Sequence, residues 1–387
     1  MKNISLLVLV LFFSACDRDS IEDRAVAASS NIKIIGKGYD ANGNFLRNVY
    51  QYDNHRNKYN PNGSIDLFSE LGISERLYAG YFADKKGITL REYVRNNENI
   101  FHYKDFNTSK LFKISMPYIN TSQWTYWHHN EVIYFFYKED DTYNATDGTV
   151  EYKMKLLNLK TNEESTIGFG KFDDGFYGVK TALVGNKVYL HWNRYSYDAN
   201  TEEFFMAFDL DNLKIMDRRS DFKKDTYNLV GDDKGNCYLF GREFNYKYDY
   251  NSQSMEELSI QGETTYLYNS YTGFTNSQVI IDDKYYASTI GPQPGTGAIY
   301  PIIYDLKTGE VQWIDIFNEI TQFEEDEHPW RPIVQSYSLD YRNKVYLLGA
   351  SNNLAVPHKS HGVFTVDFEG NVLSKQKIPI APFQIIN

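Results

Sequence analysis

The chain has 387 residues and a formal net charge of −11, and 16% of its residues are aromatic. An acidic chain offers no broad basic surface to displace the counterions of nucleic-acid phosphates, so a general nucleic-acid-binding role is excluded. The many Tyr and Phe residues favour strands over helices. After the N-terminal segment, no apolar run is long enough to cross a bilayer as a helix.

The N-terminus has the pattern of an export signal. A short basic start is followed by an apolar run over residues 4–13, and small residues precede Cys16. The segment resembles a bacterial lipoprotein signal peptide, with its lipobox at Phe13-Ser14-Ala15-Cys16. This resemblance implies that Cys16 becomes the lipid-modified first residue of the mature protein. An ordinary secretory signal with a chance cysteine is the alternative.

We expect three segments along the chain. Residues 1–15 form the signal peptide, residues 16–31 a flexible tether, because they are polar and Ala/Ser-rich, and residues 32–387 a single folded domain. With lipid on Cys16, Cys237 is the only other cysteine, so no internal disulfide can form. Cys237 stands in an apolar run, where we expect a buried strand position.

One unit recurs along the chain after residue 31. It is clearest over residues 276–314, where four short apolar runs are joined by turns and one Gly/Pro-rich loop. Four such strands make an antiparallel sheet, and repetition of the sheet makes a propeller. An Asp or Asn begins the turn before the last strand of each unit, because these side chains bind nearby backbone groups. The seven positions are Asp53, Asp105, Asn158, Asp209, Asp249, Asp305 and Asp367.

These seven positions predict an all-β fold, a β-propeller of seven four-stranded blades, although irregular ends leave six or eight blades open. The first unit has no innermost strand upstream of its own. Residues 380–386 have the pattern of the segment leading into an innermost strand. We therefore predict that the C-terminal strand completes the first blade and closes the propeller, which would remove exposed strand edges.

One blade carries a more specific resemblance. Thr308-Gly309-Glu310-Val311-Gln312-Trp313 is similar to the repeat of quinoprotein-like propellers. The other units lack this Gly and Trp, so we expect neither a quinone nor any other cofactor. In architecture and export signal the chain resembles the diverse propeller lipoproteins of Bacteroidota, many of which sit beside outer-membrane nutrient importers. This resemblance implies a lipid anchor in the cell envelope, at the outer membrane, and a transporter as partner.

Candidate ligand-binding residues gather on one rim. In a propeller, the loops between blades and those between the second and third strands share a rim, called here the inter-blade rim. Arg, Trp and Tyr side chains on it could hold an anionic or sugar-like ligand. We predict binding by Trp192, Arg194, Tyr195, Tyr197, Arg242, His328, Trp330, Arg331, His358 and His361. The pairs Arg91/Arg95 and Arg218/Arg219 map to the same rim, and His128 and His129 to the opposite one.

Metal and catalytic sites have weaker support. His358 and His361 have the spacing of metal ligands, but we expect them in a solvated loop, so no metal site is predicted. The acidic run 324–327 could supply a general acid for glycoside cleavage, although such runs are usually solvated. No Ser/His/Asp spacing, phosphate-binding Gly loop or redox Cys pair is present.

The sequence favours a binding protein over an enzyme. We expect a lipid-anchored extracytoplasmic protein that captures a small ligand, an oligosaccharide or an anionic chelate, on the inter-blade rim for a partner transporter. Two alternatives stay open. One is a glycoside hydrolase or lyase acting on the same rim, and the other is a noncatalytic protein-interaction scaffold in the cell envelope.

Overall fold

The computed structural model describes residues 32–39, 45–53, 58–73, 78–84, 86–93, 98–117, 124–146, 148–173, 176–194, 203–220, 222, 226–268, 278–290, 299–316, 319, 333–351, 361–378 and 380–386. The expected signal peptide and tether, with Cys16, lie outside these residues. The chain divides into two compact units, Met1–Glu70 with Ile316–Asn387, and Leu71–Asp315. Within the described ranges, no helix is long and apolar enough to cross a membrane.

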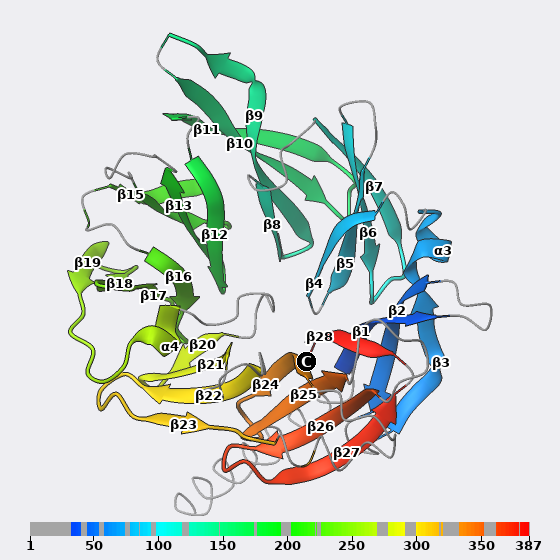
Figure 1. Ribbon diagram of the computed structural model, residues 1–387. Helices are drawn as coiled ribbons and strands as arrows, with labels where there is room; N and C mark the ends of the chain where they lie inside the picture. The colour runs from blue at the N-terminus through cyan, green and yellow to red at the C-terminus, as the bar shows by residue number, and fades with distance from the viewer. Residues whose placement is uncertain are drawn as a thin grey trace, which may run out of the picture. The chain divides into compact units, whose positions relative to one another are not determined.

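The strands form seven four-stranded antiparallel sheets, which are the blades of a β-propeller (Figure 1). In six sheets the four strands follow one another in sequence, and in the first sheet the C-terminal strand joins the three N-terminal strands. The prediction of an all-β propeller with seven four-stranded blades is therefore confirmed. Two short helices, α3 (Leu67–Leu71) and α4 (Thr265–Tyr268), lie between sheets in the sequence.

The unit Leu71–Asp315 holds the second to sixth sheets. The second sheet consists of β4 (Tyr78–Ala83), β5 (Gly87–Tyr93), β6 (Glu98–Asp105) and β7 (Leu111–Pro117), and the third of β8 (Trp124–His129), β9 (Val132–Asn144), β10 (Thr149–Asn158) and β11 (Glu164–Asp173). The fourth consists of β12 (Phe176–Val184), β13 (Lys187–Arg194), β14 (Glu203–Asp209) and β15 (Lys214–Arg219). The fifth consists of β16 (Thr226–Gly231), β17 (Cys237–Gly241), β18 (Asn245–Asp249) and β19 (Ser254–Glu257), and the sixth of β20 (Val279–Ile281), β21 (Lys284–Ile290), β22 (Ile299–Asp305) and β23 (Val311–Trp313).

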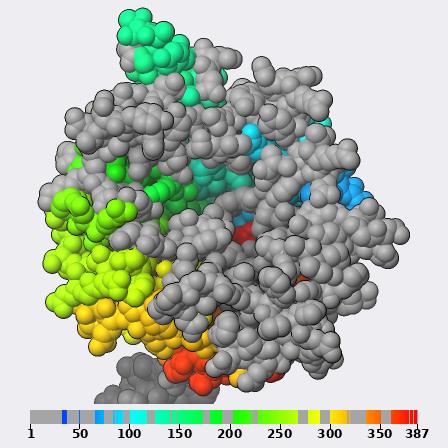
Figure 2. Space-filling view, in the orientation of Figure 1, coloured from blue at the N-terminus to red at the C-terminus, as the bar shows by residue number. Residues whose placement is uncertain are grey.

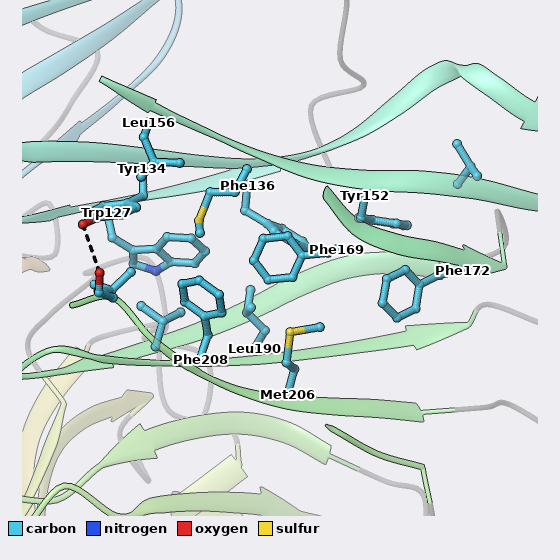
Figure 3. Close-up of a cluster of buried hydrophobic side chains, with 14 residues drawn as sticks. Trp127, Tyr134, Phe136, Tyr152, Leu156, Phe169, Phe172, Leu190, Met206 and Phe208 are labelled. Carbon is cyan, nitrogen blue, oxygen red and sulfur yellow. Dashed lines mark hydrogen bonds between the residues drawn. The ribbon is translucent and has the colours of Figure 1, made fainter. Parts of the chain in front are cut away.

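The core of this unit lies between consecutive sheets. Along β10, buried residues alternate with half-buried ones, because successive side chains of a strand point to opposite faces. Its buried residues join a cluster with β13 and β14 of the next sheet, which Figure 3 shows running from Trp127 to Phe172. Similar clusters link the second sheet to the third, the fourth to the fifth, and the fifth to the sixth. Cys237 is fully buried at the start of β17, as predicted.

The repeated Asp and Asn residues stabilise the turns, as expected. The side chain of Asp305 accepts hydrogen bonds from the backbone N–H groups of Lys307 and Thr308, at 2.9 and 3.0 Å. The bond from Thr308 is the main reason why the pKa of Asp305 is lowered. Asp105, Asn158, Asp209 and Asp249 likewise accept bonds from backbone N–H groups two or three residues further on. Asp367 accepts one from Asn371, four residues further on, in a longer turn. An Asp or Asn side chain therefore bonds to the backbone of the turn in each of these sheets.

The other unit holds the first and seventh sheets. The first consists of β1 (Ile32–Tyr39), β2 (Phe45–Asp53), β3 (Lys58–Asp66) and the C-terminal β28 (Ala381–Ile386). The seventh consists of β24 (Ile333–Asp340), β25 (Val345–Ser351), β26 (His361–Asp367) and β27 (Val372–Ile378). Strand β28 pairs antiparallel with β1, and Figure 1 shows the red and blue strands side by side. The prediction that the C-terminal strand completes the first sheet is confirmed.

Two glycines leave the space in which β28 lies. A Cβ atom on Gly36 of β1 would come within 2.6 Å of the carbonyl oxygen of Ala381. A Cβ atom on Gly349 of β25 would come within 2.7 Å of the Pro382 ring. Both distances are shorter than a carbon contact allows, so β28 fits only because neither residue has a side chain. Behind it, Ile385 joins an aliphatic cluster with residues of β1, β25 and β26.

Replacing Ile385 by Ala should lower the free energy of unfolding by about 2–5 kcal/mol, because the side chain is 5% exposed and its removal leaves a cavity. The matched control is Leu373→Ala in β27, which is 60% exposed and should change stability by less than about 0.5 kcal/mol. Urea unfolding of the two variants measures both effects. Equal midpoints for the two variants would show that β28 does not help to hold the unit together.

Candidate functional site

Most predicted ligand-binding residues lie outside the described part of the chain. This holds for Tyr195, Tyr197, His328, Trp330, Arg331 and His358. Trp192 and Arg194 are placed by backbone as the last residues of β13, and their side chains are not described. Arg242 is exposed in the turn between β17 and β18. His361 belongs to the other unit, at the start of β26.

Three expectations about the rim are wrong in detail. Residues 192–194 continue β13 instead of forming a loop, since they pair with β12 and β14. His361 is not in a solvated loop but is the first residue of β26, where burial lowers its pKa to about 4. Arg91 lies within β5 and is only 2% exposed, so it cannot meet a ligand at the surface as the sequence suggested.

A platform of one arginine on two phenylalanines stands at the end of the core between the third and fourth sheets. The Cζ atom of Arg218 lies 4.0 Å from the ring centroid of Phe172 and 4.8 Å from that of Phe204. The two rings meet edge to face at 5.3 Å. We call these three residues the Arg218 platform. Figure 3 shows Phe172 at the end of the cluster opposite Trp127, so the guanidinium lies at the outer limit of the aromatic core.

The rings under Arg218 are held in place by further aromatic contacts. Phe172 meets Tyr152 edge to face at 5.4 Å, and Tyr152 stacks on Phe136 at 5.5 Å. Phe172 itself is only 5% exposed, whereas Arg218 belongs to the exposed residues. A guanidinium over aromatic faces at such a partly exposed site gains about 0.5–1 kcal/mol from its attraction to the rings. The platform therefore fixes the charge of Arg218 at the surface.

The guanidinium of Arg218 has no carboxylate partner among the residues that the structure describes. The nearest acidic residue in sequence, Asp217, instead accepts a hydrogen bond from Nε of Arg219 at 2.7 Å. Arg219 also donates a hydrogen bond to the backbone oxygen of Gln253, in the turn before β19. Strand β19 lies in the yellow-green area of Figure 2. Burial against the rings lowers the pKa of Arg218, and arginine stays protonated throughout the physiological range.

The strand pairing of the fourth sheet relates the predicted residue Trp192 to the Arg218 platform. Trp192 of β13 lies opposite Phe204 of β14, and Arg218 of β15 lies opposite Met206, two residues further along β14. Phe204 is thus both the strand-pairing partner of Trp192 and one of the two rings of the Arg218 platform. These strand ends form the candidate functional site, and its chemistry suits an anion or a polar ligand with a flat face.

Contacts between a basic side chain and a glutamate link the second and third strands of three consecutive sheets. His102 lies 2.7 Å from Glu92 in the second sheet, Lys153 is bonded to Glu139 in the third, and His191 lies 2.9 Å from Glu203 in the fourth. In each case the partners are offset by two residues from direct opposition, a diagonal that long side chains can span. Within each sheet, the contact links the second strand to the third near the ends that precede and follow their connecting loop.

The His191–Glu203 pair is the most deeply buried of the three. The two side chains are 0% and 4% exposed, and Phe222 lies against the imidazole at 6.2 Å between centroids. Burial lowers the pKa of His191, so the ring is neutral near pH 7. With Nε2 donating to Glu203, Nδ1 is left as an acceptor that has no partner in the described structure. The pair braces β13 and β14 beneath Trp192.

Sequence reasoning missed this pair because no local motif marks it. His191 and Glu203 are twelve residues apart, and only the strand register brings them together. The sequence pattern maps Arg218 and Arg219 to the same rim and does not distinguish between them. The alternation of Phe204 and Met206 on one face of β14 could have indicated which of the two arginines faces the aromatic core. Among the described residues, no group of three His, Cys, Asp or Glu side chains could hold a metal ion.

Comparison with known proteins gives no family. No protein-family model matches the chain, and no curated protein sequence matches it. The chain is similar to the β-propeller domain of the Trilobed protease from Pyrococcus furiosus, with 11% identity and a TM-score of 0.48 over 90% of this chain and 94% of that one.

Two further solved structures are similar. One is the acylaminoacyl peptidase of Pyrococcus horikoshii, at 9% identity and a TM-score of 0.46 over 86% of this chain and 49% of that one, so the chain spans about half of that enzyme. The other is a protein of Bacteroides fragilis assigned as a 6-phosphogluconolactonase, at 9% identity and a TM-score of 0.48 over 92% and 97% of the two chains. The seven-sheet architecture rests on the strand pairing of this chain.

Acid should destabilise the protein partly through His191. Its folded-state pKa lies below the unfolded value, so the unfolded chain takes up the proton first. The stabilisation is complete above about pH 6.5 and is lost as the pH falls from there towards the folded-state pKa. The melting temperature of a His191→Gln variant should therefore fall less than that of the wild type between pH 7.5 and pH 5. Parallel profiles would contradict this assignment.

Proposed function

We propose that the protein is a lipid-anchored extracytoplasmic binding protein that captures a small ligand at the candidate functional site. The observation that supports this most directly is Arg218, whose guanidinium is fixed over Phe172 and Phe204 without a carboxylate partner in the described residues. In a chain with a net charge of −11, a surface arginine has many possible acidic partners. Arg218, which has none among the described residues, retains the capacity to bind an anion.

The energetics favour a ligand that supplies the missing partner. A hydrogen bond to a charged group contributes about 1.5–3 kcal/mol, roughly twice a neutral one. Two parallel bonds from a guanidinium that is already immobilised cost less side-chain entropy than bonds from a mobile lysine. An oligosaccharide with acidic groups or an anionic chelate fits this chemistry, and the adjoining strand end adds Trp192 and Arg194.

Anchoring at the outer membrane, with a transporter as partner, is the second part of the proposal. It is supported by the sequence before residue 32, in which Cys16 ends a lipoprotein-like signal. A Cys16→Ser variant should lose the incorporation of labelled fatty acid and move from the membrane fraction to the released fraction, because one lipid-bearing residue carries the anchor. Unchanged labelling and fractionation would remove this part of the proposal and leave the binding site unaffected.

Binding itself is testable by ligand-dependent thermal stabilisation. A panel of acidic oligosaccharides, neutral oligosaccharides and anionic chelates should contain a compound that raises the melting temperature saturably, because a ligand that binds only the folded state stabilises it. At a hundredfold excess over Kd the stabilisation is about 2.7 kcal/mol. The same mixtures should show no product by chromatography. Turnover of a saccharide, without saturable stabilisation, would favour the hydrolase or lyase instead.

A further inference from the structure

We propose that Arg218 forms a carboxylate-binding subsite, so that the ligand of this protein carries at least one carboxylate group placed against the Arg218 platform. This inference rests on the proposed binding function and specifies the chemistry of the same site. Two kinds of ligand share that chemistry: a saccharide containing a uronic acid, and a small polycarboxylate chelator. Neither a neutral saccharide nor an inorganic anion meets the requirement.

The arrangement of donors is the first argument. A guanidinium has five N–H donors in a fixed plane and no acceptor. All five side-chain donors of Arg218 are without a hydrogen-bond acceptor among the described residues, while its backbone N–H is bonded to Asp217. One face of the guanidinium is covered by Phe172, at 4.0 Å from its centroid. A ligand must therefore approach the edge of the plane, where two parallel hydrogen bonds to a flat carboxylate are possible.

The contrast with Arg219 is the second argument. Arg219 has its charge matched by Asp217 and its fork occupied by the backbone oxygen of Gln253. Arg218 and Arg219 are consecutive residues of β15. In the pairing with β14, Arg218 lies opposite Met206 and Arg219 lies opposite Phe205. The two arginines therefore project from opposite faces of β15. Arg219 stabilises the fourth sheet, whereas Arg218 lies on the apolar face of β15, where the described residues offer it no carboxylate.

The number of donors at the platform favours a carboxylate over a phosphate. Phosphate sites usually combine several donors, such as successive backbone N–H groups or a helix N-terminus. The Arg218 platform offers a single guanidinium on two hydrocarbon rings, in a protein of net charge −11. A phosphate at the platform would meet one guanidinium and, among the three platform residues, none of these additional donors. A carboxylate needs only one counter-charge, and its planar shape matches the exposed edge of the guanidinium.

The phenylalanines make the subsite rigid. The guanidinium is held by Phe172 and Phe204. Phe204 meets Phe172 edge to face, and Phe172 in turn contacts Tyr152 within the core. A ligand therefore does not have to order a long flexible side chain, which normally costs about 0.5–1.5 kcal/mol. Lysine at this position would keep the charge but would lose the planar pair of donors.

The test is a calorimetric titration of the full-length protein with four probes. These are trigalacturonate, citrate, the neutral saccharide galactotriose and inorganic phosphate. We expect saturable binding of trigalacturonate or citrate, and the one that binds identifies the source of the carboxylate. The Arg218→Gln and Arg218→Lys variants should each lose about tenfold or more in affinity for that probe. The Arg219→Gln variant should bind it within about twofold of the wild type, although its melting temperature should fall.

Each other outcome overturns the carboxylate subsite. Equal affinity of the wild type and Arg218→Gln for a bound carboxylate would show that the subsite lies elsewhere. Phosphate binding that is tighter than either carboxylate and depends on Arg218 would replace the ligand class. Binding of galactotriose alone would refute the subsite but leave the proposed binding function standing. Binding of none of the four probes would refute the subsite, and the wider ligand panel would then decide the binding function by itself.

Discussion

The structure depends on the packing of one sheet's apolar side chains against the facing side of the next. Between the third and fourth sheets this contact is largely aromatic, with Phe169 against Phe208 at 5.1 Å and against Phe136 at 5.3 Å. Large rings fill the wedge between two twisted sheets at a low cost in side-chain entropy. The Arg218 platform lies at one end of this contact, and the position of its guanidinium follows from the packing of Phe172 and Phe204.

Buried polar groups in the same region are organised by strand register. The diagonal pair His191–Glu203 lies where β13 and β14 approach the rim, and a carboxylate that is 4% exposed is stable there only with a donor beside it. A neutral histidine supplies that donor without introducing a second buried charge. The hydrogen bond between these two side chains keeps β13 and β14 in register close to the end of β13, which includes Trp192.

The sequence predicted the repeating parts of the fold well because their causes are local. Asp305 accepts hydrogen bonds from backbone groups two and three residues away, and Asp367 from one four residues away, so the pattern is visible within a single unit. The pairing of residues 380–386 with the first sheet could be predicted, because the first unit lacks one strand and this segment is a strand without a unit of its own. Long-range contacts were not predictable in this way. Arg218 and Phe172 are joined only through the packing of two sheets, and the strand end at residues 192–194 looked like a loop because its residues are polar.

The pairing of β28 with β1 also constrains how the chain can fold during synthesis. Lys33 pairs with Ile386, so one end of the first sheet is made of residues from the two extremes of the sequence. The five sheets of Leu71–Asp315 can each form from contiguous strands as they are made, but the first sheet cannot be completed until β28 has been made. Until then the edge of β1 is unpaired and open to wrong partners. The first sheet is therefore the one whose completion comes latest relative to the synthesis of its first strand.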